Sequence, residues 1–315
     1  MPDRLQLPPE QDFGFYQRRK HDKWRQVQPP APPLEAPVAD SHAHIHMLPD
    51  PAWELARCAA NGVDYICMIV DPSEDGPAPF EDLDAWLFDA GAHLADEGLD
   101  LAVPTVTIAA GVHPHNAKLY DAAIEDELLD RLDDPRVVAL GEIGLDYHYD
   151  LSPRETQREV FRRQIELAKQ AGLPVALHLR GGEDPARDNA HREAFEILQE
   201  VGFPECGTLL HCCALPPDEL QPWVDAGCYI AYGGAITFKN ADAAREGALI
   251  VPTGSLLLET DSPYMTPEPM RGAACTPAHV IFTAAALAEI RGVAPGPARE
   301  AFLRQLHANT EAFYA

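Results

Sequence analysis

Short runs of apolar and β-branched residues recur along most of the chain, about thirty residues apart. There are eight of them, at residues 38–44, 63–70, 103–111, 137–141, 173–178, 208–212, 228–232 and 256–260. Runs of this length and composition are typical of β-strands. The pattern therefore predicts eight strands.

The segments between these runs follow helical spacing. The clearest is residues 154–172, where Val160, Phe161 and Ile165 share one face and Gly172 ends the pattern. Further helices are predicted at residues 51–60, 80–95, 122–132, 190–201, 217–226, 277–291 and 296–309. Strands that alternate with helices pair in parallel, and eight such units favour a closed (β/α)8 TIM barrel over an open doubly wound sheet. No glycine-rich dinucleotide fingerprint follows the first run, which disfavours a Rossmann fold.

Residues 1–37 do not follow this rhythm, and we interpret them as an N-terminal extension to a barrel of residues 38–315. Residues 18–25 form a basic cluster that contains one Trp, and residues 29–33 are almost all Pro. Proline runs resist regular structure and extend the chain. We expect a semi-ordered arm that lies on the acidic body, with guidance of an anionic substrate as the alternative role.

The net charge limits which classes of partner the surface of the chain can attract by charge alone. Its 24 Lys and Arg residues are outnumbered by 50 Asp and Glu residues, which gives a formal net charge of −26. This balance argues against a basic surface that binds phosphate passively. A nucleic-acid substrate would need a local positive site, which bound metal ions could supply. The alternative is that the acidity serves solubility alone.

Cysteine usage and hydropathy bear on the compartment. The seven cysteines are scattered and form no Cys-X-X-Cys pair, which argues against a disulfide framework or a zinc ribbon. The first ten residues have no apolar signal core, and no apolar run reaches the length of a membrane span. We expect a reduced, cytoplasmic protein without membrane contact, a monomer or weak oligomer without a stable protein partner.

The predicted strands end in polar side chains that can bind metal. These are His42 and His44, His113 and His115, Glu142 and Asp146, His178 and Arg180, His211, and Glu259 and Asp261. In a barrel the carboxyl ends of the strands share one face, where catalytic groups lie. Buried imidazoles and carboxylates are costly unless they are paired or coordinated. Four histidines and two carboxylates from this set suit two divalent ions with one bridging carboxylate, and the nitrogen-rich set favours Zn, Mn, Fe or Co over Mg alone.

Several of these motifs resemble those of the TatD family of metal-dependent deoxyribonucleases, whose barrels are of the amidohydrolase type. The resemblance rests on the motifs at residues 40–44, 111–115, 141–146, 157–168, 177–180, 233–240 and 258–264, in matching order and spacing. It implies a hydrolase of phosphodiester bonds, typically a 3′–5′ exonuclease on DNA, with two divalent ions (Zn, Mn, Mg, Fe or Co).

The resemblance also implies roles for individual residues. The first ion would be held by His42, His44, Glu142 and Asp261. Glu142 would bridge to a second ion held by His178 and His211. Asp261 is the candidate general base, so Asp261 and Glu142 are the expected catalytic carboxylates.

Four further residues are expected near the substrate. His113, His115 and Asp146 would contact phosphate or orient ligands; the alternative is that Pro114 shapes a turn that His115 caps. Arg180 would bind a phosphate with both guanidinium nitrogens, unless it forms a surface ion pair.

Other conspicuous residues are expected to be structural. His46, His148 and His279 are interpreted as ordinary surface or cap residues. Gly233 and Gly234 would permit a close backbone approach at the seventh strand.

Some positions depart from the family pattern. Residues 212–215 read Cys-Cys-Ala-Leu where the family has Phe-Ser-Gly after a cysteine, the segment 181–191 is longer than usual, and residues 275–277 differ as well. Two alternatives therefore stay open. One is the same metal barrel acting on an amide, ester or lactone of a small metabolite, as in relatives from biosynthetic clusters. The other is a non-catalytic scaffold with residues 1–37 as a docking arm.

Overall fold

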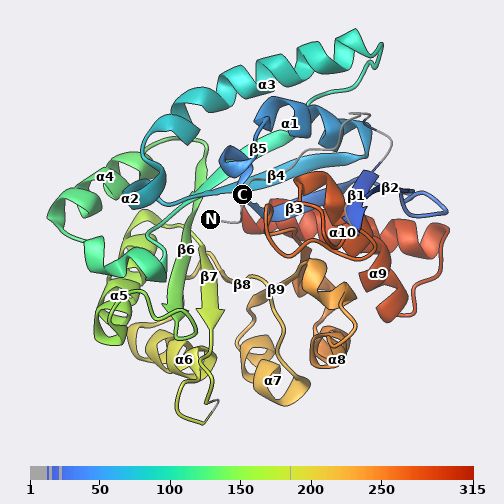
Figure 1. Cartoon of the computed structure of the whole chain (residues 1–315). Helices are drawn as coiled ribbons and strands as arrows, with labels where there is room; N and C mark the ends of the chain where they lie inside the picture. The colour runs from blue at the N-terminus through green and yellow to red at the C-terminus, as the bar shows by residue number, and fades with distance from the viewer. Residues whose placement is uncertain (1–12, 14–15, 21–22, 185) are drawn as a thin grey trace.

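The barrel consists of eight parallel strands wrapped by helices (Figure 1). The computed structural model describes residues 13, 16–20, 23–184 and 186–315. The strands are β3 (Val38–Ala43), β4 (Val63–Val70), β5 (Thr105–Ala110), β6 (Val137–Asp146), β7 (Val175–Arg180), β8 (Thr208–Leu210), β9 (Tyr229–Tyr232) and β10 (Leu256–Leu258). They pair in chain order from β3 to β10. The predicted (β/α)8 TIM barrel is confirmed.

The barrel closes between its first and last strands. Ala43 forms a parallel bridge with Ser262. The His44 amide donates to the carbonyl of Ser262 at 2.8 Å, and the Asp261 amide donates to the carbonyl of His42 at 2.9 Å. The closing seam therefore runs through segments that carry three of the predicted metal ligands.

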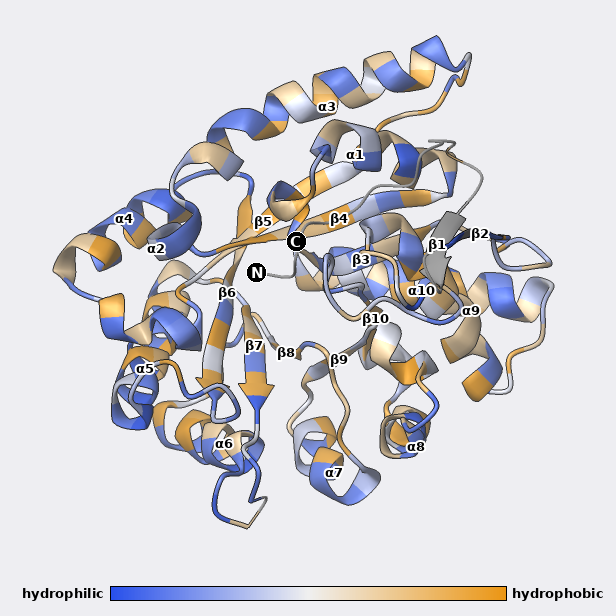
Figure 2. Cartoon of the chain, in the orientation of Figure 1, coloured by the Kyte–Doolittle hydropathy of each residue, from blue (hydrophilic) through white to orange (hydrophobic). Residues whose placement is uncertain are grey.

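Helices cover the outside of the strands. They are α1 (Pro51–Ala60), α2 (Pro72–Asp75), α3 (Ala78–Asp96), α4 (Ala122–Leu132), α5 (Arg154–Ala171), α6 (Ala190–Val201), α7 (Pro217–Asp225), α8 (Asp242–Ile250), α9 (Val280–Ile290) and α10 (Pro297–Phe313). In α5 the apolar stripe with Val160, Phe161 and Ile165 is buried, and Gly172 ends the helix in the left-handed region with φ 67°. Figure 2 shows hydrophobic and hydrophilic residues mixed along the outer helices, as expected for helices with one buried face.

Several elements differ from the prediction. β6 continues to Asp146 instead of ending at residue 141, because Ile143 and the following residues pair with β7. α10 continues to Phe313, beyond residue 309. The helix predicted at 277–291 begins with a 3₁₀ turn, Pro277–His279, before α9.

A further difference is α8, which was not predicted. Gly247 lies in the middle of this helix, and glycine lowers helix propensity. A Cβ atom at Gly247 would collide with the carbonyl of Leu215. Glycine therefore lets α8 pack against the neighbouring loop, a tertiary effect that outweighs its propensity.

An apolar layer fills the inside of the barrel, and aromatic residues near the end of α10 pack against it. Each strand contributes a buried residue to it: Ala39, Cys67, Ala109, Ala139, Ala176, Leu209, Ala231 and Leu257. Phe313 and Tyr314 belong to the same cluster, and the Tyr314 hydroxyl donates to the carbonyl of Ser41 at 2.7 Å. The end of the barrel where the strands begin is therefore filled by aromatic side chains.

The described part of residues 1–37 packs on the barrel. β1 (Tyr16–Lys20) and β2 (Lys23–Val27) form an antiparallel pair, which the sequence did not predict. Phe13 is buried, with its ring centre 4.3 Å from that of Trp53. The Arg299 guanidinium of α10 donates to Glu35 Oε2 at 2.6 Å. Residues 1–12 and, within the basic cluster, the side chains of 18–22 and 24 lie outside the described residues.

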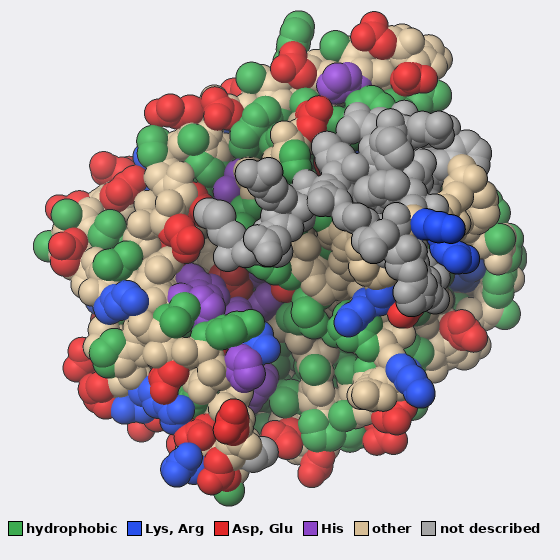
Figure 3. All heavy atoms as spheres, viewed as in Figure 1, with side chains coloured by type: hydrophobic (Ala, Val, Ile, Leu, Met, Phe, Trp, Pro, Cys, Tyr) green, Lys and Arg blue, Asp and Glu red, His purple; other side chains and the backbone are tan. Residues whose placement is uncertain are grey.

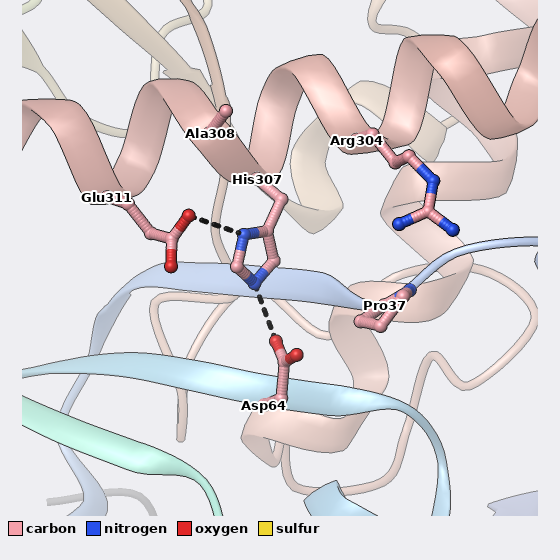
Figure 4. A pocket seen from close by; sticks show the side chains of 6 residues that line it. All are labelled: Pro37, Asp64, Arg304, His307, Ala308 and Glu311. Carbon is pink, nitrogen blue, oxygen red and sulfur yellow. Dashed lines mark hydrogen bonds and ion pairs between the residues drawn. The ribbon is translucent and has the colours of Figure 1, made fainter.

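A surface pocket of about 240 Å³ lies at the end where the strands begin (Figure 4). We name it the lower pocket; it is lined by Pro37, Asp64, Arg304, His307, Ala308 and Glu311. His307 Nε2 lies 2.6 Å from Asp64 Oδ1, and His307 Nδ1 lies 3.3 Å from Glu311 Oε2. Both ring nitrogens of this histidine are therefore paired with carboxylates.

None of the helices that the structure describes combines the length and the apolar character that a bilayer crossing requires.

Candidate metal centre

The polar strand ends lie above the apolar layer of the barrel interior. Ala176 and Leu209 face inward, and side chains two positions further along a strand point the same way. His178 and His211 occupy those positions, and the same alternation beyond β10 leads to Asp261. Figure 3 shows several histidine side chains gathered near the middle of the face in view.

Two strands reach the same face only through irregular pairing. His42 lies three residues beyond Ala39, and Glu142 lies three beyond Ala139. In a regular strand an odd separation places two side chains on opposite faces. The pairing register of both β3 and β6 shifts where these residues lie. Such an irregularity re-aims the side chains that follow it, and both His42 and Glu142 point into the barrel mouth.

Glu142 is the centre of the arrangement. Its carboxylate oxygens lie 3.1 Å from His178 Nδ1, 3.1 Å from His211 Nε2, 3.5 Å from His44 Nε2, 3.7 Å from His42 Nε2 and 4.0 Å from His113 Nε2. These histidines come from four different strand ends. A buried carboxylate that faces this many imidazoles is suited to bridge two cations.

Asp261 completes the group. Its Oδ1 atom lies 3.6 Å from His44 Nε2 and 4.0 Å from His42 Nε2. We name the six predicted ligands the mouth cluster: His42, His44, Glu142, His178, His211 and Asp261. Potential ligand atoms lie within 4.8 Å of one another in three overlapping sets, and one of these sets adds His113. The structure therefore brings together all six residues that the resemblance implies as ligands.

The donor atoms of the mouth cluster fit divalent ions. Both ring nitrogens of His42 and Nδ1 of His211 are buried without a hydrogen-bond partner among the described residues. Leaving a buried polar atom unpaired costs about 1–3 kcal/mol. Separations of 3.5 to 4.0 Å within the cluster exceed hydrogen-bond length. Two ligand atoms that bind the same ion, each at about 2.1 Å, would lie roughly 3–3.5 Å from each other.

Burial and neighbouring charges set protonation states that favour metal binding. Burial, together with the nearby His211, lowers the pKa of His42 to about 4, so this ring is neutral at pH 7. Burial alone would raise the pKa of Glu142, but His113 and His42 hold it well below its usual range. A neutral imidazole and an ionised carboxylate are the forms that bind metal.

Asp146 supports the cluster from behind. It is fully buried, and its Oδ2 atom lies 2.9 Å from His115 Nε2 and 3.2 Å from His178 Nε2. Burial lowers the pKa of His178, but hydrogen bonds to Asp146 and Glu142 outweigh it and raise this pKa to about 9. Metal binding by His178 must therefore displace a proton. Asp146 is placed to orient this ring.

His113 presents a hydrogen-bond donor to the site. Its Nδ1 atom accepts the amide of His115 at 3.2 Å, so the neutral ring carries its hydrogen at Nε2. In the alternative interpretation His115 would cap this turn, but the structure has His113 as the cap. Asp71 accepts the His113 amide at 3.0 Å, and Gln164 bonds both backbone groups of Val112 at 2.7 and 3.0 Å. These contacts fix the loop.

Two buried carboxylates beside the mouth cluster were not assigned roles from the sequence. Asp40 accepts the Thr260 amide at 2.9 Å and its hydroxyl at 2.5 Å, which ties β3 to the segment after β10. Glu259 accepts the Cys212 amide at 2.5 Å, and its Oε2 atom lies 3.8 Å from His211 Nδ1. Among the described residues neither of these last two atoms has a hydrogen-bond partner. The sequence did contain a signal for Glu259, because strand alternation places it on the same face as Asp261.

Arg180 lies at the rim of the mouth. Its guanidinium carbon is 4.8 Å from the ring centre of Tyr149. Within the part of the chain that the structure describes, no ion pair involves Arg180. The surface ion pair considered as its alternative role is therefore not found there.

The three histidines interpreted as surface or cap residues occupy different environments. His148 is exposed. His279 is buried and acts in a cap, since its Nδ1 atom accepts the Thr276 amide at 3.2 Å. His46 is not an ordinary surface residue, because its side chain is only 9% exposed and its Nε2 atom lies 3.1 Å from Asp75 Oδ1.

Two glycines allow close backbone approaches near the centre. A Cβ atom at Gly234 would overlap the carbonyl of Met265, so the predicted close approach is confirmed at this position. Gly144 pairs with His178 in register and has φ 151°, and a Cβ there would overlap the His178 carbonyl. Glycine thus permits β6 and β7 to pair beside a candidate ligand.

Comparisons with known proteins agree with this geometry. A family model described as TatD related DNase matches residues 39–315. The Escherichia coli K12 protein YcfH, described as an uncharacterized metal-dependent hydrolase, is 34% identical over 265 residues, which cover 82% of this chain and 89% of YcfH. A Salmonella typhimurium protein described as the 3′–5′ ssDNA/RNA exonuclease TatD is 32% identical over 179 residues, which cover 56% of this chain and 65% of that protein. The solved structure of the TatD homologue YjjV from E. coli K12 matches with a TM-score of 0.70 and 27% identity, and covers 88% of this chain and 97% of YjjV.

Proposed function

Because the chain belongs to the family of TatD-related DNases and is a metal-dependent hydrolase, we propose that it removes nucleotides from the 3′ end of single-stranded DNA. One observation carries the proposal. A single buried carboxylate, Glu142, lies within 4.0 Å of ring nitrogens from five histidines at the barrel mouth. The relative described as an exonuclease supports the choice of substrate.

Two divalent ions are assigned to the mouth cluster. The first would be held by His42, His44, Glu142 and Asp261. The second would be held by His178 and His211, and Glu142 would serve both ions. The imidazole-rich set favours Zn, Mn, Fe or Co over Mg alone.

The residues of the chain divide the work of hydrolysis. Ions bound at the mouth would act as Lewis acids on the phosphate and lower the pKa of a water molecule. The Asp261 carboxylate lies at the edge of the cluster, 3.6 Å from His44 Nε2, and takes the proton from the attacking water. His113 and Arg180 present N–H donors to the phosphate oxygens. On a chain with a net charge of −26, the Arg180 guanidinium is a local positive group of the kind that an anionic substrate needs, and the neutral His113 ring adds a hydrogen-bond donor.

The test is metal-dependent digestion of a 5′-labelled single-stranded oligonucleotide. With Mn²⁺ or Mg²⁺ the wild-type chain should shorten the labelled strand stepwise, and a 3′-terminal phosphorothioate should block the reaction. His42→Ala and Asp261→Asn should each abolish shortening. Unchanged activity in both variants would refute the assignment. A wild-type chain that releases no nucleotide but turns over esters, lactones or amides would replace phosphodiester hydrolysis with carbonyl hydrolysis.

A further inference from the structure

An aromatic side chain at the rim of the mouth is anchored to the candidate metal centre. Tyr149 follows β6, and its side chain is 54% exposed. Single exposed apolar side chains are ordinary, but the position of this residue is fixed by the site. The Tyr149 amide donates to Asp146 Oδ1 at 2.8 Å, and Oδ2 of the same carboxylate lies 3.2 Å from His178 Nε2. The ring is therefore attached to the residue that orients a candidate ligand.

Arg180 places a positive charge beside the Tyr149 ring. It pairs in register with Asp146, and its guanidinium carbon lies 4.8 Å from the Tyr149 ring centre. Arginines on α5 are paired with carboxylates, for example Arg154 with Asp188. Arg180 has no such partner among the residues that the structure describes. An unpaired guanidinium two residues beyond His178, or about 6–7 Å along a strand, is suited to an anionic group next to the metal centre.

Three side chains contact the Tyr149 ring. The Arg180 guanidinium covers part of it, and the rings of His115 and His148 meet it nearly at right angles, with ring centres 5.4 and 4.8 Å away. More than half of the side chain still faces solvent. An exposed aromatic face beside a cation is the combination with which proteins bind single-stranded nucleic acid, because bases stack on the ring and the cation binds the backbone.

We propose that Tyr149 and Arg180 form a nucleotide platform, in which the tyrosine ring stacks on the base next to the scissile bond and the guanidinium binds a neighbouring phosphate. The inference rests on the proposed phosphodiester hydrolysis and goes beyond it, because it names the part of the substrate that is recognised. An enzyme with this platform would prefer phosphodiesters that carry a nucleobase over phosphodiesters without one.

The experiment compares substrates with and without a base. Two 5′-labelled oligothymidylates would be used with Mn²⁺, one ending in thymidine and one ending in a tetrahydrofuran abasic residue, beside bis(4-nitrophenyl) phosphate. We expect kcat/KM of the wild-type chain to be about tenfold lower for the abasic end, in line with the strength of base stacking on aromatic side chains. Tyr149→Ala and Tyr149→Leu should lose this preference, whereas Tyr149→Phe should keep it.

A matched control and a second variant separate the two parts of the platform. Phe88 on α3 is 77% exposed, so Phe88→Ala removes an exposed aromatic away from the mouth and should keep the full preference. Arg180→Gln should reduce the slope of log KM against log salt for the oligonucleotide by about one.

The outcomes distinguish this inference from the proposed function. Hydrolysis of the oligonucleotides without a preference for the base, or with a preference that survives in Tyr149→Ala, overturns the platform and leaves the proposed function standing. Failure of the wild-type chain to hydrolyse any of the three phosphodiesters overturns both.

Discussion

Histidines and carboxylates gather at both ends of the barrel, and the two groups differ in how completely their atoms are paired. In the lower pocket the two nitrogens of His307 lie 2.6 and 3.3 Å from carboxylate oxygens of Asp64 and Glu311 (Figure 4). In the mouth cluster His42 is fully buried, and among the described residues neither of its ring nitrogens has a hydrogen-bond partner. The histidine of the lower pocket has a carboxylate partner at each ring nitrogen, whereas the mouth cluster contains ring nitrogens that remain free to bind a metal ion.

The pairing of buried polar atoms therefore separates a candidate site from an ordinary surface ion pair. Both groups would be found by counting titratable residues. Of the two groups, the mouth cluster alone keeps buried polar atoms without a hydrogen-bond partner among the described residues, and leaving such atoms unpaired is costly. The lower pocket contains an ion pair at a partly exposed surface, between His307 on α10 and Asp64 at the start of β4. We expect it to contribute modestly to stability and not to catalysis.

The largest expected effect comes from exchanging one glutamate in each group. Glu142→Gln removes the negative charge shared by five histidines, and nuclease activity should fall by about 10³-fold or more, or about 4 kcal/mol of transition-state stabilisation. Glu311→Gln makes the same chemical change beside His307 and should leave kcat/KM within about twofold of wild type. Equal losses in the two variants would remove the distinction between the groups.

Metal addition should stabilise the chain through the mouth cluster only. At a Mn²⁺ concentration one hundred times Kd, binding stabilises the folded state by about 2.7 kcal/mol, which corresponds to a Tm rise of about 5 °C for a chain of this size. Thermal unfolding followed by circular dichroism measures the shift. Glu311→Gln should keep this shift and Glu142→Gln should lose it. A full shift in Glu142→Gln would mean that the ion binds elsewhere.

Glu259→Gln tests whether a second carboxylate orients His211. The two side chains face each other at 3.8 Å, and carboxylates that hold a ligating histidine typically contribute a factor of about 10–100 in metal affinity. Titration calorimetry with Zn²⁺ or Mn²⁺ should show affinity reduced by about tenfold, with the ion count unchanged. Unaltered affinity would leave Glu259 with a role only in binding the Cys212 amide.

Much of this comparison could be predicted from the sequence. The barrel follows from eight apolar runs that alternate with helices, and regular alternation from Ala176 to His178 and from Leu209 to His211 places two candidate ligands on the inward face of the strands. The inward direction of Glu142 could not be read from alternation, because it depends on a register shift in β6 that leaves no sequence signal.

The rest could not be predicted because it depends on distances between segments far apart in the chain. The pairing of His307 with Asp64 joins residues 243 positions apart. The position of Glu259 beside His211 is likewise a tertiary property. For the same reason, the motif at residues 111–115 placed His115 beside the site but could not show that its ring binds Asp146 and that His113 caps the turn.

The smallest expected effect is the pH dependence of the lower pocket. The hydrogen bond to Asp64 is the main cause that raises the pKa of His307 above its ordinary value, and burial partly opposes it. A raised folded-state pKa means that the stabilisation is fully present below the unfolded pKa of about 6.5 and is lost as pH rises through the folded value. His307→Gln should therefore cost about 0.5 kcal/mol at pH 6 and less at pH 9.

Urea unfolding at the two pH values measures this cost. His148→Gln is the matched control, because His148 is exposed and forms no ion pair among the described residues. A cost for His307→Gln that grows with pH would contradict the assignment of His307 as a charged partner of Asp64.

The assignment of the mouth cluster as a dinuclear centre is tested most directly by the metal content of the purified chain after loading with Mn²⁺ or Zn²⁺ and dialysis, measured by inductively coupled plasma mass spectrometry. We expect about two ions per chain for wild type and for Glu311→Gln, because a dinuclear centre with a bridging carboxylate needs both. Glu142→Gln should lose most of the metal. A wild-type chain that binds no divalent ion, or a Glu142→Gln variant that keeps both, would refute the dinuclear centre.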